Sequence, residues 1–293
     1  MPEEDFAPQK NYFEDVPVAD RGSHIKGASS YDWGMKNRLG RIFREATGRT
    51  VMLAVDHGYF QGPTTGLERL DLAVPPLLPF ADALMATRGA IRTSVPASLT
   101  CPIVVRASGG PSVLRELSDE RLAMSVDDAV RLNASALAVQ LFIGSEHETQ
   151  SIKNLTTLVD AGMAAGIPVV AVIAVGREMV RDARYFRLAT RMAAELGAQV
   201  VKCYYTDEGF ASVASTCPVP LVVAGGKKLP EREALEMTYR SMDAGALGVD
   251  MGRNIFQSDS PIGMIQAVSG IVHGGLSVDD AFTLYEDTRT SLK

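Results

Sequence analysis

The sequence predicts an α/β fold of the (β/α)8 barrel type, preceded by an N-terminal extension. Eight short apolar runs, most of them β-branched or small and bounded by Gly, Pro, Asp or Ser, are typical of buried strands. They recur at roughly 20–35 residues, the spacing of a strand followed by a helix. A doubly wound open sheet is the main alternative, but no GxGxxG follows the first run. The length of 293 residues fits a single barrel.

Residues 1–25 are polar and lack periodicity, so we expect an N-terminal arm that is loose or ordered only by a partner subunit. Residues 26–293 then form the barrel domain, because no linker or shift in composition divides them. The expected strands are Val51–Val55, Ala83–Ala86, Ile103–Val105, Ala136–Phe142, Val169–Val175, Val200–Tyr205, Leu221–Ala224 and Leu247–Met251. A first helix is predicted over Tyr31–Phe43, where apolar residues follow helical spacing. Leu72–Phe80 contains three prolines, so any helix there is short or irregular.

Longer helices are predicted between the later strands and at the end of the chain. Ser151–Gly166 begins with a capping serine and ends at a glycine, and Glu178–Gly197 is amphipathic and also ends at a glycine. Pro230–Gly245 has proline and acidic residues in its first turn. Pro261–His273 and Val278–Thr288 complete the predicted barrel.

Composition excludes several classes of function. The net charge is −6 and the pI is about 5.3, so we expect no nucleic-acid partner. The three cysteines, Cys101, Cys203 and Cys217, have no CxxC spacing, which disfavours a disulfide framework or a metal site. The N-terminus is acidic and polar, unlike a signal peptide, and no long apolar stretch could span a membrane. We therefore expect a cytoplasmic protein that binds no membrane.

Lys202 interrupts the apolar run Val200–Tyr205. By strand alternation, Val200, Lys202 and Tyr204 share one face. If that face points into the barrel, the ammonium is removed from water, and we expect Lys202 to lose its proton because an unpaired buried charge is costly. A neutral amine is the nucleophile that a Schiff-base enzyme needs. The alternative is that Lys202 lies near the strand end and extends to water.

Active sites of (β/α)8 barrels lie at the C-terminal ends of the strands. The first strand ends in Asp56-His57-Gly58, where a carboxylate and an imidazole could perform acid/base catalysis; alternatively, Asp56 is a cap and His57 a loop residue. Arg106, after the third strand, could bind an anion, but a surface ion pair is the commoner role. Residues 144–148 (GSEHE) superficially resemble metal ligands, but nothing elsewhere completes a site, so we expect a solvated loop.

Two glycine-containing loops predict a phosphate site. Gly225 and Gly226 follow the seventh strand, and Gly252 and Arg253 follow the eighth. Barrels commonly bind phosphate between these two loops, because glycines let backbone amides approach the oxygens and arginine adds a bidentate contact. The alternative is that both loops are merely tight turns. A lysine on the sixth strand beside such a site indicates an enzyme that forms an imine with a phosphorylated ketone or aldehyde.

The segments Asp56-His57-Gly58, VVKCYYT, AGGKK and MGRNIFQ resemble the class I aldolase family that includes deoxyribose-phosphate aldolase and archaeal-type fructose-bisphosphate aldolase. Longer stretches, among them VMLAVDHGYFQGPTTGLER and GVDMGRNIFQSDSP, are similar to the thiolase branch of that family that serves autoinducer-2 processing. The resemblance covers nearly the whole chain after the N-terminal arm. It implies a Schiff-base role for Lys202, a catalytic role for Asp56, and phosphate binding at Gly225, Gly226, Gly252 and Arg253.

The same resemblance implies acetyl transfer from 3-hydroxy-5-phosphonooxypentane-2,4-dione to coenzyme A, giving acetyl-CoA and dihydroxyacetone phosphate. No cofactor is expected to stay bound, and coenzyme A is a co-substrate. Homo-oligomers, as pentameric rings or decamers, are also implied. Related aldolases have a tyrosine proton donor after the fifth strand, but residues 173–178 (IAVGRE) contain none. Tyr204, Tyr59, His57 or a water molecule could replace it. An ordinary aldolase acting on another sugar phosphate, such as fructose 1,6-bisphosphate, and a non-catalytic sugar-phosphate sensor remain alternatives.

Overall fold

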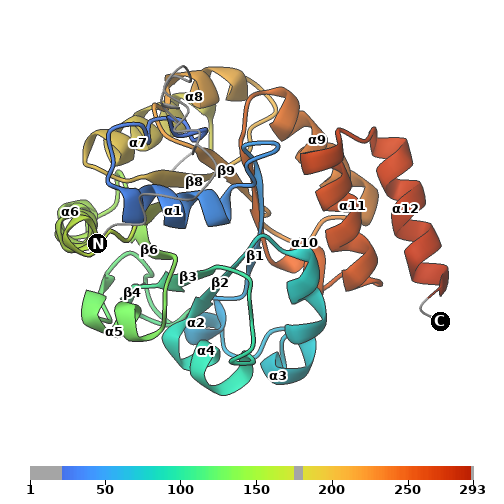
Figure 1. Cartoon of the computed structure of the whole chain (residues 1–293), viewed down its shortest axis with the longest axis horizontal. Coiled ribbons are helices and arrows are strands. Elements are labelled where there is room, and N and C mark those ends of the chain that lie inside the picture. The colour runs from blue at the N-terminus through green and yellow to red at the C-terminus, as the bar shows by residue number, and fades with distance from the viewer. Residues whose placement is uncertain (1–21, 175–180, 292–293) are drawn as a thin grey trace, which may run out of the picture.

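The computed structural model describes residues 22–174 and 181–291 (Figure 1). The barrel strands are β1 (Thr50–Ala54), β2 (Ala83–Thr87), β3 (Ile103–Arg106), β6 (Ala136–Leu141), β7 (Val169–Ile173), β8 (Val200–Tyr204), β9 (Leu221–Ala224) and β10 (Gly248–Met251). Within the described residues these eight parallel strands close in the order β1-β10-β9-β8-β7-β6-β3-β2. Each strand overlaps one predicted apolar run, so the predicted (β/α)8 barrel is confirmed.

The helices surround the barrel (Figure 1). They are α1 (Trp33–Ile42), α2 (Gly58–Gln61), α3 (Leu70–Ala73), the 3₁₀ helix η1 (Pro75–Phe80), α4 (Arg88–Ser94), α5 (Val126–Arg131), α6 (Glu148–Ala165), α7 (Ala183–Glu195), α8 (Phe210–Thr216), α9 (Glu231–Asp243), α10 (Arg253–Phe256), α11 (Pro261–Gly274) and α12 (Val278–Ser291). A short antiparallel pair, β4 (Ser108–Gly109) and β5 (Arg121–Leu122), follows β3. The short helices α3 and η1 confirm the irregular structure predicted for the proline-rich segment.

The predicted starts of α6 and α7 are wrong. Ser151 is not a cap but lies inside α6, where its hydroxyl accepts a hydrogen bond from the backbone N–H of Phe142 at 3.1 Å. Helix α7 begins only at Ala183, because Asp182 caps it by accepting from the N–H of Tyr185 at 2.7 Å. Residues 178–180 of the predicted helix lie outside the described residues.

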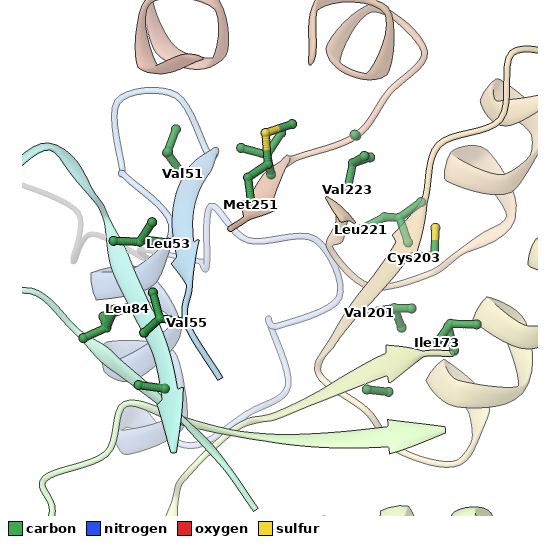
Figure 2. Packing of buried hydrophobic residues seen from close by; sticks show 14 of the residues in the cluster. Val51, Leu53, Val55, Leu84, Ile173, Val201, Cys203, Leu221, Val223 and Met251 are labelled. Carbon is green, nitrogen blue, oxygen red and sulfur yellow. The ribbon is translucent and has the colours of Figure 1, made fainter. Parts of the chain in front are cut away.

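The barrel strands alternate between two apolar layers. Val51, Leu53, Val201 and Cys203 are buried on the outer side of their strands, against the surrounding helices (Figure 2). Full burial of one such side chain contributes about 1.5–3 kcal/mol. The intervening residues point inward, and Lys202 belongs to this inward set.

Helix α1 closes the N-terminal end of the barrel. Met35 and Leu39 of α1 are buried against inward-facing strand residues such as Met52 and Val200. Asp32 caps the helix by accepting from the N–H of Met35 at 2.8 Å. The cavity described below opens at the other end of the barrel, at the C-terminal ends of the strands. None of the described helices is both long and apolar enough to cross a membrane.

Candidate active site

A cavity of about 470 Å³ lies at the C-terminal ends of the strands. It is lined by every residue that the sequence predicts for the site: Asp56, His57, Lys202, Gly225, Gly226, Gly252 and Arg253. The volume is in the range of small-molecule sites. Residues from β1, β8 and the loops after β9 and β10 thus meet in one place.

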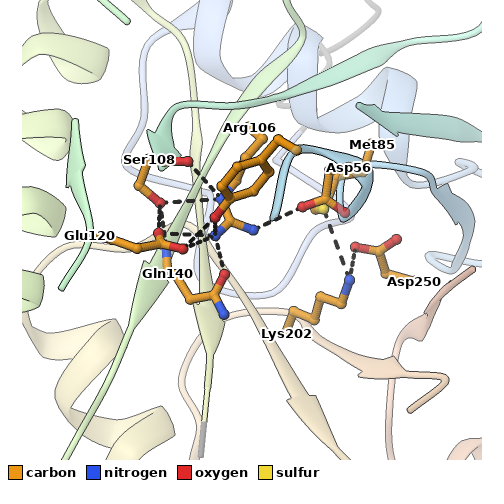
Figure 3. A network of polar contacts seen from close by, with 9 residues as sticks. Asp56, Met85, Arg106, Ser108, Glu120, Gln140, Lys202 and Asp250 are labelled. Carbon is orange, nitrogen blue, oxygen red and sulfur yellow. Dashed lines mark hydrogen bonds and ion pairs between the residues drawn. The ribbon is translucent and has the colours of Figure 1, made fainter. Parts of the chain in front are cut away.

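Lys202 extends from β8 into the barrel interior (Figure 3). Its Nζ lies 2.8 Å from Asp250 Oδ2 and 3.9 Å from Met85 Sδ. Because only 10% of the side chain is exposed, the alternative of an ammonium extended to water is wrong. The expectation that Lys202 loses its proton assumed an unpaired charge. Burial lowers the pKa of Lys202, but the Asp250 and Asp56 carboxylates more than offset this effect and leave the pKa raised.

Asp250 on β10 is a partner that the sequence did not identify. It is 1% exposed, and its Oδ1 has no hydrogen-bond partner within the described part of the chain. Burial raises the pKa of Asp250, while Lys202 opposes that rise. A carboxylate at an inward position of the otherwise apolar strand Gly248–Met251 was the available signal.

Arg106 at the end of β3 holds the Asp56 carboxylate. Its Nη1 donates to Asp56 Oδ2 at 2.9 Å, and its side chain is 4% exposed, so the predicted surface ion pair is in fact buried. Burial raises the pKa of Asp56, but Arg106 and Lys202 outweigh burial and hold the pKa below its ordinary value. Asp56 is therefore a carboxylate inside the cavity.

A second buried carboxylate, Glu120, completes the environment of Arg106 (Figure 3). Arg106 Nη2 lies 2.7 Å from Glu120 Oε1, and the Gln140 side chain accepts from the same nitrogen. The Ser108 hydroxyl donates to Glu120 Oε2 at 2.6 Å. Sequence reasoning missed Glu120 and Gln140, because Glu120 precedes the short strand β5 and only the folded chain brings it to Arg106.

His57 follows Asp56 and stacks on Phe256, with ring centroids 5.5 Å apart. Its Nε2 is buried and has no hydrogen-bond partner among the residues that the structure describes. Burial lowers the pKa of His57, and the positive charge of Arg253 lowers it further. The Asp56 carboxylate opposes this decrease without cancelling it. A neutral imidazole with a free ring nitrogen can exchange a proton with a bound ligand.

The two glycine loops lie side by side because Asn254 connects them. Asn254 Nδ2 donates to Gly225 O at 2.7 Å, and its Oδ1 accepts from the N–H of Leu229 at 2.8 Å. At Gly252 an added Cβ would lie 2.4 Å from Ala54 O, so only glycine fits at the start of α10. Gly226 has a φ of +70°, which side chains disfavour. The sequence predicted the glycines but assigned no role to Asn254.

The tyrosines proposed as proton donors occupy different positions. Tyr59 donates to Glu120 Oε1 at 2.5 Å and accepts from Arg106 at 3.1 Å, and burial raises its pKa, so it is a hydrogen-bonded neutral phenol. Tyr204 lines the cavity, with the Arg181 guanidinium 4.2 Å from its ring centroid. Residues 175–178, where the aldolase tyrosine is missing, lie outside the described residues.

The acidic and histidine-containing segment 144–148 is the loop that leads into α6, and its last residue, Glu148, is the first residue of that helix. The Glu148 carboxylate accepts a hydrogen bond from the N–H of Gly144. Across residues 22–174 and 181–291, no group of three His, Cys, Asp or Glu side chains is arranged to hold a metal ion.

Comparisons with known proteins agree with this geometry. Residues 50–258 match the DeoC/LacD family aldolase. The chain is 56% identical over 286 residues to an uncharacterised aldolase from Pasteurella multocida, covering 98% of this chain and 99% of the relative. It is 57% identical over 282 residues to the 3-hydroxy-5-phosphonooxypentane-2,4-dione thiolase of Escherichia coli, covering 96% and 97% of the two chains.

Solved structures are similar as well. An archaeal fructose 1,6-bisphosphate aldolase superposes with a TM-score of 0.74 at 26% identity, over 82% of this chain and all of that chain. A related structure of an archaeal fructose-1,6-bisphosphate aldolase, with a TM-score of 0.73 at 26% identity over 81% of this chain and 99% of that chain, has its catalytic lysine bound to a carbinolamine intermediate. On the family match and these relatives, the chain belongs to the DeoC/LacD family of aldolases.

Proposed function

We propose that this protein is a thiolase that splits 3-hydroxy-5-phosphonooxypentane-2,4-dione. It transfers the acetyl unit to coenzyme A and releases dihydroxyacetone phosphate, as a step in autoinducer-2 degradation. The identity of 57% to the Escherichia coli thiolase, over almost the full length of both chains, supports this substrate. The structural observation that carries the proposal is an inward-facing lysine, Lys202, in one cavity with two glycine loops and Arg253.

The positions of the phosphate and carbonyl groups in the dione match this arrangement. The phosphate on C5 would bind at Gly225, Gly226, Gly252 and Arg253, where backbone amides and a guanidinium are available. The C4 carbonyl is adjacent to C5 and would then meet Lys202, which forms an imine with it. The remaining carbons would extend toward Asp56 and the Arg106 network.

The imine makes the C2–C3 bond breakable. When the thiolate of coenzyme A adds to C2, collapse of the adduct breaks the C2–C3 bond, and its electron pair moves into the C4 iminium to give an enamine. A proton is then added at C3, and hydrolysis releases dihydroxyacetone phosphate and Lys202. His57, with a lowered pKa and an unpartnered buried Nε2, is well suited to exchange that proton.

Coenzyme A requires cations of its own, because it carries several phosphoryl groups. Arg115 follows β3 and Arg181 precedes α7; both are exposed and line the same cavity as the glycine loops. Phe60, Val113 and Leu117 provide apolar lining between α2 and the Arg115 loop. We therefore expect the pantetheine arm to enter here with its phosphates near Arg115 and Arg181.

The second candidate is an aldolase acting on another sugar phosphate, favoured by the likeness to the archaeal aldolase. Incubation with the dione, with and without coenzyme A, separates the two: the thiolase forms acetyl-CoA only when coenzyme A is present. Product formed equally without coenzyme A contradicts the thiolase proposal. The resemblance also supports a cytoplasmic protein that forms a homo-oligomer, as a pentameric ring or decamer. Light scattering tests the number of subunits.

A further inference from the structure

Asp250 is a buried carboxylate in direct contact with the amine that the proposed reaction uses. We propose that Asp250 is a catalytic residue that carries protons during imine formation, from Lys202 Nζ to the oxygen of the substrate carbonyl. The proposal rests on the proposed nucleophilic role of Lys202, but it does not depend on coenzyme A.

The geometry gives each carboxylate oxygen of Asp250 a separate task. Oδ2 forms an ion pair with Lys202 Nζ at 2.8 Å, which is close enough for a proton to pass between them. Oδ1 is buried, and the described residues offer it no hydrogen-bond partner. A buried, unsatisfied acceptor is costly, so its retention beside a substrate cavity points to a bound group that completes it. The carbonyl oxygen, once protonated to a hydroxyl, can donate to it.

The chemistry requires such a carrier. Imine formation converts an ammonium and a carbonyl into an iminium and water, so two protons leave nitrogen and end on oxygen. Asp250 first accepts a proton from the Lys202 ammonium, and the freed amine adds to the carbonyl carbon while the C=O electron pair moves to oxygen. Asp250 returns this proton to the oxygen to give the carbinolamine. It then transfers the second proton in the same way, the C–O bond breaks, and water departs with Asp250 again a carboxylate.

Two carboxylates are close to Lys202, and their environments assign them different roles. Asp56 is held by Arg106 at 2.9 Å and its pKa is lowered, which makes it a poor proton acceptor. Asp250 pairs with Lys202, and burial raises its pKa, which makes it the better acceptor. A pair of carboxylates whose pKa values are pushed apart is a common basis for acid/base assignment.

The Asp250→Asn variant separates proton transfer from simple ion pairing. Without the Asp250 charge, burial lowers the pKa of Lys202. Asp56 and Tyr204 are the remaining groups that raise this pKa, and His57 also interacts with both Asp56 and Lys202. The variant therefore contains more neutral amine at a given pH. If Asp250 only held the ammonium, imine formation in Asp250→Asn would be as fast as in the wild type or faster. If Asp250 carries protons, imine formation in the variant should be slower by about 100-fold or more.

The experiment measures the rate at which borohydride traps an adduct of dihydroxyacetone phosphate on the full-length protein, across pH 5–9, by intact mass. Asp82→Asn is the control, since Asp82 is also a buried, paired carboxylate, with His273 at 2.7 Å, but lies outside the cavity. The trapping rate of Asp82→Asn should match that of the wild type even if the variant is less stable. Trapping in Asp250→Asn at or above the wild-type rate would overturn the proposal.

Chemical rescue provides the second test. Formate added to Asp250→Ala should restore trapping in a concentration-dependent way, because a small carboxylate can occupy the vacated space. Formate should have no effect on Lys202→Ala, which lacks the amine. If Asp250→Ala is folded by circular dichroism but formate does not accelerate trapping, Asp250 is not the carrier. Because no coenzyme A is added, failure of the thiolase proposal leaves this result unaffected.

Discussion

The guanidinium of Arg106 donates to the Asp56 carboxylate at 2.9 Å, and both side chains are almost fully buried. The same guanidinium pairs with Glu120 at 2.7 Å. One cation therefore pairs with two carboxylates from different loops. Arg106 fixes the position of Asp56 beside Lys202, although it has no assigned contact with the substrate.

Replacing Arg106 with methionine should destabilise the fold and disturb the site. Removing one partner of a buried ion pair leaves uncompensated charge and costs about 3–5 kcal/mol. Urea unfolding measures this loss. The control is Arg121→Met, because Arg121 pairs with Asp119 at the surface and should contribute at most about 1 kcal/mol. Equal losses in the two variants would contradict the buried network.

Asp56 should make stability depend on acid pH. Its pKa in the folded protein lies below the ordinary value of 3.8, so the folded state favours the ionised form. Its contribution to stability is complete above about pH 3.8 and decreases as the pH falls toward the native pKa. Urea unfolding between pH 5 and 3 should show a steeper loss in the wild type than in Asp56→Asn. Parallel slopes would show that the Asp56 pKa is not lowered.

Arg253→Ala should weaken substrate binding more than the chemical step. A hydrogen bond to a charged group contributes about 1.5–3 kcal/mol, so KM for the phosphorylated dione should rise about tenfold or more. The value of kcat should change little, because phosphate contacts are similar in the ground and transition states. Steady-state kinetics measures both constants. An unchanged KM would exclude phosphate binding by Arg253.

Arg115→Ala should affect coenzyme A alone. An exposed ionic contact contributes up to about 1 kcal/mol, so KM for coenzyme A should rise about fivefold. KM for the dione, and the rate with N-acetylcysteamine as a phosphate-free thiol, should remain at wild-type values. Arg121→Ala, outside the cavity, is the matched control. If KM rose equally for coenzyme A and for N-acetylcysteamine, the coenzyme A phosphates would not bind at Arg115.

Much of the fold could be predicted from sequence because the barrel strands are short, apolar and evenly spaced. The alternation along Val200–Tyr204 put Lys202 on one face with Val200, and the structure shows that this face points into the barrel. The start of α6 could not be predicted from Ser151, since that hydroxyl binds the backbone of Phe142, a contact between the helix and the preceding strand end. Capping preferences describe local geometry and do not include such contacts.

Residues that line the cavity could be predicted where one strand end carries its own signal, as at Asp56 and Gly252. The charge partner of Lys202 was not predictable, because Asp250 lies on a strand distant in sequence. Arg106 likewise looked like a surface residue until Glu120 and Gln140 were brought to it by the fold. Partners of buried charges are determined by tertiary packing, which residue spacing does not specify.

The most direct test of the proposed function is the product analysis of the phosphorylated dione with coenzyme A. The wild-type protein should form acetyl-CoA and dihydroxyacetone phosphate in equal amounts, and only when coenzyme A is present. Lys202→Arg should retain the fold but form neither product, because a guanidinium does not readily form an imine. Equal product formation without coenzyme A, or by the Lys202→Arg variant, would contradict a lysine-dependent thiolase.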